Sequence, residues 1–287
     1  MGGFNMKKII VTGGAGFIGY NLCKKLVSLG HDVISIDNYS TGLTSNHIES
    51  VEYISQDISD YDAMENLIQG ASVVFHLAAL ARIQPSFSYP KKYFDSNVIG
   101  TFNVCQLCSA FGIPVIFSGS SSHHSGKFKN PYTFTKDSSE ELCQLFDKIY
   151  GLKQSIARFY NVYGPNHIED GEYATVIARW DKAHREKKPL TIYGDGSKER
   201  DFTHVDDIVD GLIKIWETQS YGIIFELGRG RKFSLNEAAS LYKPSFGITY
   251  LEDKKGEAQS VECNAELAKL HLGWEAKNNL EDWIKNK

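Results

Sequence analysis

The stretch that decides the fold is KIIVTGGAGFIG, residues 8–19. Its first five residues are mostly apolar and β-branched, which is typical of a short buried strand. Glycines follow at positions 13, 16 and 19, and apolar residues then recur with helical spacing as far as Leu29, where Gly30 can end the helix. A glycine-rich turn between a strand and a helix lets the backbone approach a pyrophosphate, and the helix N-terminus offers it free N–H groups. The stretch therefore predicts a dinucleotide site.

An acidic residue supports this prediction and narrows it. Asp37 ends the next predicted strand, Val33–Asp37, at the spacing where a carboxylate can bind both hydroxyls of a ribose. A carboxylate at that place disfavours a 2′-phosphate. NAD is therefore favoured over NADP.

The pattern of a short apolar strand followed by an amphipathic helix continues to Phe159. Further strands are predicted at Val51–Ile54, Val73–Ala78, Val115–Ser118 and Ser155–Phe159, and helices at Ser59–Ile68, Tyr93–Phe111 and Tyr132–Tyr150. Such alternation is typical of a parallel sheet covered on both faces. After Asn161 the elements become shorter. We predict an α/β protein, with a Rossmann-type doubly wound parallel sheet in an NAD-binding domain (residues 1–160) and a smaller C-terminal α/β substrate-binding lobe (mainly residues 161–287, some segments returning to the first domain).

The composition excludes several classes of protein. The chain has 287 residues, of which 42% are hydrophobic, and its 31 basic and 35 acidic residues give a formal charge of -4. This balance gives no electrostatic reason to expect nucleic acid or an anionic membrane as a partner. No apolar run approaches the roughly 18 residues of a membrane span. Five irregularly spaced cysteines favour a reduced, cytoplasmic protein, and no residue cluster predicts a metal site.

A candidate acid–base group follows the dinucleotide site along the chain. Tyr132 and Lys136 lie one turn apart at the start of a predicted helix, so their side chains share a face. A lysine ammonium beside a phenol lowers the phenol pKa from about 10 toward neutrality, and the phenol can then accept a proton from an alcohol. Upstream lies the serine-rich turn Ser118–Ser122, at the end of a predicted strand, where a side chain points into the ligand crevice.

With these motifs the chain resembles the extended short-chain dehydrogenase/reductases, and among them the NAD-dependent nucleotide-sugar epimerase/dehydratase family. The similarity covers nearly the whole chain, from Ile9 to Glu275. The segments that carry it are Thr12–Gly19, Asp37-Asn38, Asp57-Ile58, His76–Ala79, Asn97–Thr101, Pro131-Tyr132-x-x-x-Lys136, Arg158–Pro165, Tyr193–Gly196 and Arg200–Phe202.

The resemblance implies NAD as the cofactor and gives roles to individual residues. Ser121, counted back from Gly126, resembles the serine that hydrogen-bonds the reacting hydroxyl, Tyr132 resembles the base, and Lys136 the residue that binds the nicotinamide ribose. The cofactor-binding residues implied are Gly13, Gly16, Phe17, Ile18, Gly19, Asp37, Asn38, Asp57, Ile58, Leu77, Ala78, Ala81, Asn97, Tyr132, Lys136 and Tyr160. The substrate-binding residues implied are Asn161, Thr175, Val176, Thr191, Tyr193, Arg200, Lys254 and Val261.

The resemblance also bears on the reaction. Dehydratases of the family carry an Asp-Glu pair just after the active-site hydroxyl, and decarboxylases carry a Glu near that point, whereas this chain has Ser122 and His123. The epimerase pattern remains, so we expect a UDP-hexose or UDP-N-acetylhexosamine 4-epimerase, an isomerase that works through a transient 4-keto sugar with bound NAD. Two alternatives stay open: a nucleotide-sugar dehydrogenase, reductase or other epimerase of the family, and a non-catalytic NAD-binding regulator.

Three further features are left as hypotheses. His123 and His124 either face solvent or contact the sugar. Val261 resembles a gate position where a small side chain admits N-acetylhexosamines, although it can equally be a core residue. The helices Tyr93–Phe111 and Tyr132–Tyr150 resemble the pair that forms the family's dimer, so a homodimer is expected.

Overall fold

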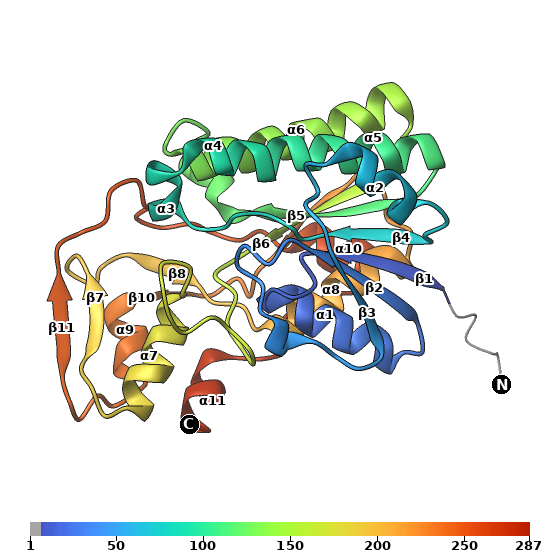
Figure 1. The fold of residues 1–287 in the computed structure, drawn as a ribbon. Coiled ribbons are helices and arrows are strands. Elements are labelled where there is room, and N and C mark those ends of the chain that lie inside the picture. Colours follow the sequence, from blue (N-terminus) through green and yellow to red (C-terminus); the bar gives the residue numbers. More distant parts are fainter. Residues whose placement is uncertain (1–6) are drawn as a thin grey trace.

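The computed structural model describes residues 7–287 and contains a seven-stranded parallel sheet. Its strand order is β3-β2-β1-β4-β5-β6-β9, so the order reverses between β1 and β4 (Figure 1). The strands are β1 (Lys8–Thr12), β2 (Asp32–Asp37), β3 (Val51–Ser55), β4 (Val73–His76), β5 (Val115–Ser120), β6 (Gln154–Phe159) and β9 (Ile224–Leu227). The first six were predicted. The sequence analysis missed β9, which pairs with β6 far from it in the chain.

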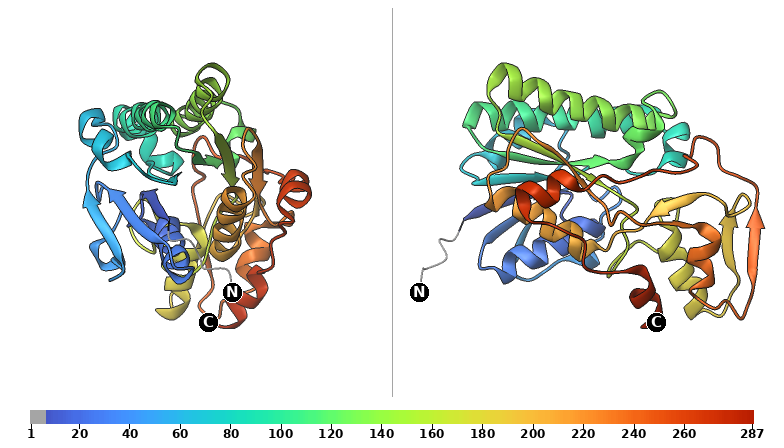
Figure 2. Two further views of the ribbon diagram at one scale, coloured as in Figure 1. Left: turned by 90° about the vertical axis from the view of Figure 1, so that its right-hand side faces the viewer. Right: turned by 180° about the vertical axis from the view of Figure 1, so that it is seen from behind.

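Helices cover both faces of this sheet, as Figure 2 shows. On one face lie α1 (Phe17–Ser28), α8 (Val205–Glu217) and α10 (Glu266–Leu272), and on the other α2 (Tyr61–Ile68), α5 (Gly100–Phe111) and α6 (Pro131–Tyr150). Each face has its own core. Within β1, Ile9 and Val11 are buried in one core and Ile10 in the other, as expected when successive side chains of a strand alternate. The predicted doubly wound α/β fold is confirmed.

The helix predicted at Tyr93–Phe111 is a composite. It consists of α4 (Pro90–Tyr93), the π-helical segment η2 (Phe94–Ile99) and α5. A π turn has one more residue than an α turn, and such turns are frequent at functional sites. Two short elements precede and follow this region, α3 (Ile83–Ser88) after β4 and the 3₁₀ segment η3 (Ser121–Ser125) after β5, and another 3₁₀ segment, η1 (Thr44–Asn46), follows β2.

A smaller lobe lies at one end of the sheet (Figure 1). It contains a parallel strand pair, β7 (Leu190–Tyr193) with β11 (Ile248–Leu251), and an antiparallel pair, β8 (Glu199–Asp201) with β10 (Lys232–Ser234). The helices α7 (Val176–Arg185), α9 (Leu235–Ser240) and α11 (Leu280–Lys285) complete it around a separate apolar core. In residues 7–287, no helix has both the length and the apolar character needed to cross a membrane.

Candidate active site

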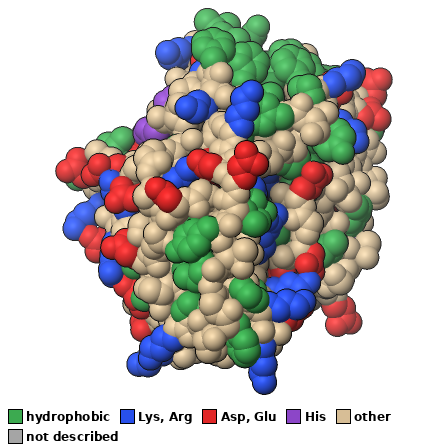
Figure 3. Space-filling model, turned by 90° about the vertical axis from the view of Figure 1, so that its left-hand side faces the viewer, with side chains coloured by type: hydrophobic (Ala, Val, Ile, Leu, Met, Phe, Trp, Pro, Cys, Tyr) green, Lys and Arg blue, Asp and Glu red, His purple; other side chains and the backbone are tan. Residues whose placement is uncertain are grey.

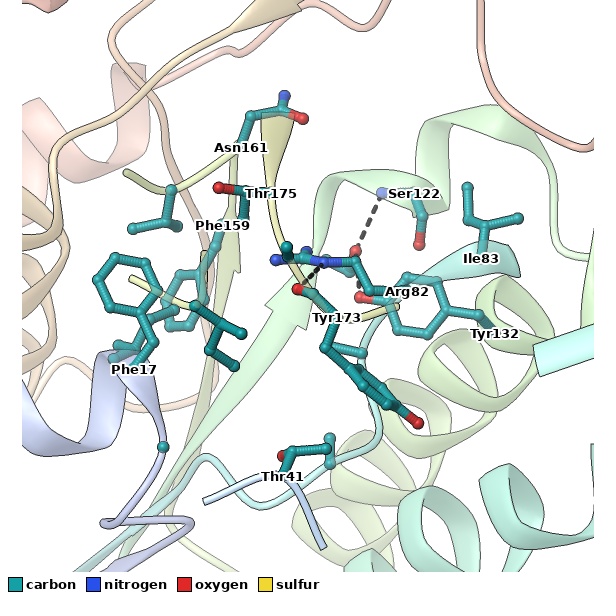
Figure 4. Close-up of a pocket in the computed structure, with 18 of the residues that line it drawn as sticks. Phe17, Thr41, Arg82, Ile83, Ser122, Tyr132, Phe159, Asn161, Tyr173 and Thr175 are labelled. Carbon is teal, nitrogen blue, oxygen red and sulfur yellow. Dashed lines mark hydrogen bonds between the residues drawn. The ribbon is translucent and has the colours of Figure 1, made fainter. Parts of the chain in front are cut away.

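A cavity of about 460 Å³ lies between the carboxyl ends of the strands and the smaller lobe. Its walls come from the turn after β1, the loops after β4 and β5, the segment after β6, and β7 with its neighbours in the lobe. The cavity therefore opens where the strand order reverses, which is the usual ligand position in doubly wound folds. Figure 4 shows its central part, with side chains from several of these segments pointing inward.

The glycine turn closes one end of the cavity and is packed too tightly for side chains. A Cβ on Gly13 would lie 2.8 Å from the backbone N of Ala78, and a Cβ on Gly19 would lie 2.1 Å from the carbonyl O of Gly13. Gly13 also has φ of +74°, a conformation that other residues rarely adopt. Only glycine fits at these two positions, so the backbone itself forms the wall, as a pyrophosphate site requires.

Asp37 is held in place beside this turn. One carboxylate oxygen accepts a hydrogen bond from Ala15 N at 3.0 Å and the other accepts one from Tyr39 N at 2.8 Å. Desolvation raises the pKa of Asp37, and the two backbone donors oppose that rise. The carboxylate lines the cavity in a fixed orientation, which suits the ribose-binding role predicted for it.

Most of the predicted cofactor residues line this cavity. They are Gly13, Gly16, Phe17, Ile18, Gly19, Asp37, Asn38, Ile58, Leu77, Ala78, Ala81, Tyr132 and Lys136. Two others lie just behind its wall. Asp57 accepts a hydrogen bond from Asn38 at 2.7 Å, and the Asn97 amide exchanges hydrogen bonds with Leu80 N and O at 2.8 and 3.1 Å. In this structure these two side chains support the wall and do not form its surface.

Tyr160, another predicted cofactor residue, does not line the cavity. The side chain is fully buried, and its hydroxyl donates to Glu226 Oε2 at 2.8 Å, on β9. The residues on either side of it, Phe159 and Asn161, line the cavity instead. Because successive side chains at a strand end point in opposite directions, Tyr160 cannot face the cavity together with its two neighbours. In this structure Tyr160 lies behind the cavity wall, and its role beside the nicotinamide stays a prediction.

The Tyr132 hydroxyl is paired with a serine at the end of β5. It donates to Ser120 Oγ at 3.1 Å, and Ser120 Oγ also accepts a hydrogen bond from Ser122 N at 3.2 Å (Figure 4). Ser121, which the resemblance singles out, lines the same cavity but makes no such bond to Tyr132. The geometry thus places Ser120 in contact with the phenol, and the role of Ser121 stays a prediction.

The charge environment of Tyr132 differs from the expected one. Desolvation raises its pKa, while the hydrogen bond with Ser120 and the positive charge of Arg82 act in the opposite direction. Lys136 is buried and donates to Ser118 O at 2.5 Å, and burial lowers the pKa of its ammonium to about 8. In this structure the cation that acts most on the phenol is therefore Arg82, which the sequence analysis did not single out.

The other end of the cavity carries cations and belongs mainly to the lobe. All of the predicted substrate residues line the cavity: Asn161, Thr175, Val176, Thr191, Tyr193, Arg200, Lys254 and Val261. Arg200 Nη2 donates to Glu257 Oε2 at 3.0 Å, and the Lys254 ammonium lies 3.7 Å from the centre of the Tyr193 ring. Glu257 was not predicted. Its carboxylate partly neutralises the arginine expected to hold a diphosphate.

The histidine pair does not line this cavity. His123 Nδ1 lies 3.1 Å from Asp137 Oδ1, and His124 Nε2 lies 2.7 Å from Glu226 Oε1. Both rings are thus paired with carboxylates outside the residues that form the cavity wall. Of the two hypotheses left open, contact with the sugar receives no support from this arrangement.

Comparison with known protein families identifies the family of the chain. The model of the family described as NAD dependent epimerase/dehydratase matches residues 9–228. The chain belongs to this family. NAD is accordingly its cofactor, because the glycine turn gives the cavity a close backbone, the oriented Asp37 carboxylate an acceptor and the buried Lys136 a donor, all of which NAD needs.

Individual members of the family resemble the chain over nearly its full length. It is similar to the UDP-glucuronate 4-epimerase of Thermodesulfobacterium geofontis, with 31% identity over 96% of this chain and 93% of that one. It is also similar to a UDP-glucuronic acid decarboxylase of Arabidopsis thaliana, with 29% identity over 96% of this chain and 68% of that one. The solved structure of the Thermotoga maritima UDP-glucose 4-epimerase with UDP-glucose superposes with a TM-score of 0.92, at 31% identity, over 97% of this chain and 96% of that one. These relatives support an NAD-dependent enzyme acting on nucleotide sugars, and they include more than one reaction.

Proposed function

We propose that this family member is a nucleotide-sugar 4-epimerase that acts on a UDP-hexose or UDP-N-acetylhexosamine through a transient 4-keto sugar. The observation that carries the proposal is the Tyr132–Ser120 hydrogen bond, which lies in the same cavity as the glycine turn and the cationic residues Arg200 and Lys254. A substrate anchored by its diphosphate at the cationic end can present its sugar hydroxyl to Tyr132. Relatives that act on UDP-sugars support the choice of nucleotide.

The residues then share the work as follows. Arg200 and Lys254 hold the diphosphate by charge, while the sugar ring stays free to turn in the cavity. Tyr132 takes the proton from the hydroxyl at C4 and later returns it, with Ser120 holding the phenol in position. Lys136 and Asp37 hold the two ribose ends of the cofactor. Bound NAD supplies reversible hydride acceptance at C4, so the net redox change is zero and the cofactor need not leave.

The segment after β5 supports epimerisation over dehydration or decarboxylation. Ser121–Ser125 reads SSHHS and carries no carboxyl group to protonate a leaving hydroxyl. The two histidines of this segment are already paired with Asp137 and Glu226, away from the cavity. Reversible oxidation at one carbon needs only the Tyr132 phenol and the cofactor.

A substrate panel tests the proposal. Purified protein is incubated with UDP-, dTDP-, GDP- and CDP-sugars, and the products are identified by NMR. We expect a C4 epimer from at least one UDP-sugar, no net change in free NAD, and loss of about 1,000-fold in kcat for Tyr132→Phe, since a positioned general base contributes about 10²- to 10⁴-fold. Release of NADH in step with product would favour a dehydrogenase instead, and no conversion with tight NAD binding would favour a regulator.

Val261 supports access of N-acetylated sugars. It lines the cavity, and a valine side chain is small. We infer that an N-acetyl group fits beside it. Val261→Tyr should then abolish turnover of UDP-N-acetylglucosamine while turnover of UDP-glucose persists, and equal turnover of both by the variant would contradict the inference.

We also propose that the chain forms a homodimer through α5 and α6. Their outer faces expose large apolar side chains, with Phe102, Leu145, Ile149 and Tyr150 being 39, 48, 65 and 62% exposed. Figure 3 shows hydrophobic side chains gathered along the top of the molecule, where this helical layer lies. Light scattering should give a dimer mass for the native chain and a monomer for Ile149→Asp. Leu270→Asp, on α10, changes a residue on another face that is even more exposed than Ile149, and it should leave the mass unchanged.

A cytoplasmic location is proposed from the cysteines. All five lie within the described residues and are free thiols. An odd number of irregularly spaced cysteines suits a protein of a reducing compartment.

A further inference from the structure

Arg82 has an unusual backbone for a residue with a side chain. Its φ is +123° and its ψ is 140°, a region that is almost restricted to glycine. The conformation is held by its neighbours, because the buried Tyr93 hydroxyl donates to Arg82 O at 2.9 Å. Two residues upstream, Leu80 is fixed by the Asn97 amide. Strain of this kind persists where the surroundings enforce it, often at ligand-binding residues.

The strained backbone directs the Arg82 side chain into the cavity. Its Nε donates to the carbonyl of Tyr173 at 2.9 Å, which fixes the plane of the guanidinium (Figure 4). Among residues 7–287, no carboxylate forms an ion pair with Arg82, and its two terminal nitrogens have no hydrogen-bond partner. A cation removed from bulk water without a counter-ion is unfavourable. The guanidinium therefore presents two parallel donors to whatever occupies the cavity.

A second polar group in the same wall also lacks a partner. The hydroxyl oxygen of Ser122 is buried and makes no hydrogen bond with any described residue, although Ser122 lines the cavity. Figure 4 shows this side chain on the same side of the cavity as Tyr132 and Ile83. Two polar groups with free donors, one of them charged, thus line the same cavity as the catalytic phenol.

The position of Arg82 separates it from the phosphate-binding residues. In Figure 4 the Arg82 side chain lies between Tyr132 on one side and Thr175 and Asn161 on the other. The nucleotide phosphates already have Arg200 and Lys254 at the cationic end. If Tyr132 faces the hydroxyl at C4, the two adjacent ring carbons are C3 and C5, and C6, the substituent of C5, is within reach of groups beside the phenol.

We propose that Arg82, with the Ser122 hydroxyl, binds a carboxylate at C6 of the sugar, so that the preferred substrate is a UDP-hexuronic acid. The proposal rests on the proposed function and makes its substrate class more specific. A planar guanidinium with both terminal nitrogens free matches a carboxylate in a bidentate pair. A neutral CH₂OH group at the same place would leave the arginine without a counter-ion.

Binding measurements test the proposal independently of turnover. Calorimetry on NAD-loaded protein compares UDP-glucuronate, UDP-glucose and UDP alone, with native chain, Arg82→Met and Arg231→Met. Arg231 is an exposed arginine outside the cavity and serves as the matched control. We expect the native chain and Arg231→Met to bind UDP-glucuronate about 100-fold more tightly than UDP-glucose, and Arg82→Met to bind the two equally, because charge-assisted hydrogen bonds contribute on that order.

A second variant guards against misfolding. Arg82→Gly removes the guanidinium and also relieves the backbone strain, so it should fold at least as well as native protein and show the same loss of preference. Equal affinity of the native chain for the two sugars, or a preference that survives in Arg82→Gly, would overturn the proposal. Carboxylate preference without any epimer in the NMR panel would instead reject the proposed function and leave the binding role of Arg82 standing.

Discussion

The two ends of the cavity are built in different ways. At the cofactor end the wall is backbone, and its critical residues are close in the chain, as with Gly13, Gly19 and the Asp37 carboxylate that Ala15 N orients. At the sugar end the wall is made of side chains from distant segments, among them Arg82, Ser122 and Glu257. The first end depends on glycine and local hydrogen bonds. The second depends on which loops the folded chain brings together, so substitutions in these loops can change the substrate specificity without changing the fold.

The strongest test of this contrast is Gly19→Ala at the cofactor end. The added methyl would lie 2.1 Å from Gly13 O, so helix and strand must move apart. We expect loss of more than about 100-fold in NAD affinity and destabilisation by about 1–3 kcal/mol, the usual range for overpacking. Calorimetry and thermal unfolding measure these two effects. In Gly16→Ala the nearest atom would be 3.3 Å away, so its stability should fall less.

Next in size is the effect of Lys136 on stability against pH. Its folded pKa of about 8 lies below its ordinary value of 10.5, so between these values the unfolded chain binds more protons and the free energy of unfolding rises with pH. Below pH 8 the buried ammonium opposes folding by up to about 3 kcal/mol. The variant Lys136→Met has no buried ammonium and therefore no such free-energy penalty. In urea unfolding, the variant should therefore have a larger free energy of unfolding than the native chain at pH 7.5, and this difference should become small by pH 10. A difference in free energy that does not change with pH would contradict the burial argument.

The comparison of Ser120 with Ser121 tests the centre of the cavity. Ser120 touches the Tyr132 hydroxyl and lowers its pKa, so Ser120→Ala should reduce kcat about 30-fold and move the acidic limb of the kcat profile, where the phenol loses its proton, to higher pH. Ser121→Ala is the matched control. A larger loss and a larger pH shift in the Ser121 variant would restore the assignment that the resemblance implies.

The smallest predicted effect lies at the cationic end. Glu257 Oε2 accepts a hydrogen bond from Arg200 Nη2 at 3.0 Å, so this carboxylate competes with a phosphate oxygen for the same donor. Both side chains are partly exposed, so solvent weakens the pair. Glu257→Gln should tighten UDP binding about threefold, as measured by calorimetry at low salt. Weaker UDP binding would mean that Glu257 positions Arg200 and does not compete for it.

The sequence predicts these two ends unequally. The six sheet strands, the glycine turn and Asp37 follow local rules of spacing and chain order, and the structure contains them. By contrast, β9 was missed because a four-residue strand carries little periodicity and its partner β6 is distant in sequence. Arg82 was missed because its significance lies in a positive φ and in its lack of a counter-ion, which appear only after folding. The one available signal was a charged residue in the loop after a parallel strand.

The π-helical segment η2 described above has a consequence for the helix that carries the catalytic residues. The carbonyl of Asn97, in the wide turn, accepts a hydrogen bond from Ser139 Oγ of α6 at 2.7 Å, and the Asn97 amide donates to Thr135 Oγ1 of the same helix at 3.0 Å. The extra residue of the turn makes this second use of the backbone possible. Asn97 thus joins η2 to α6, and the deletion of a single residue from η2 would disturb these two hydrogen bonds to the helix that carries Tyr132 and Lys136.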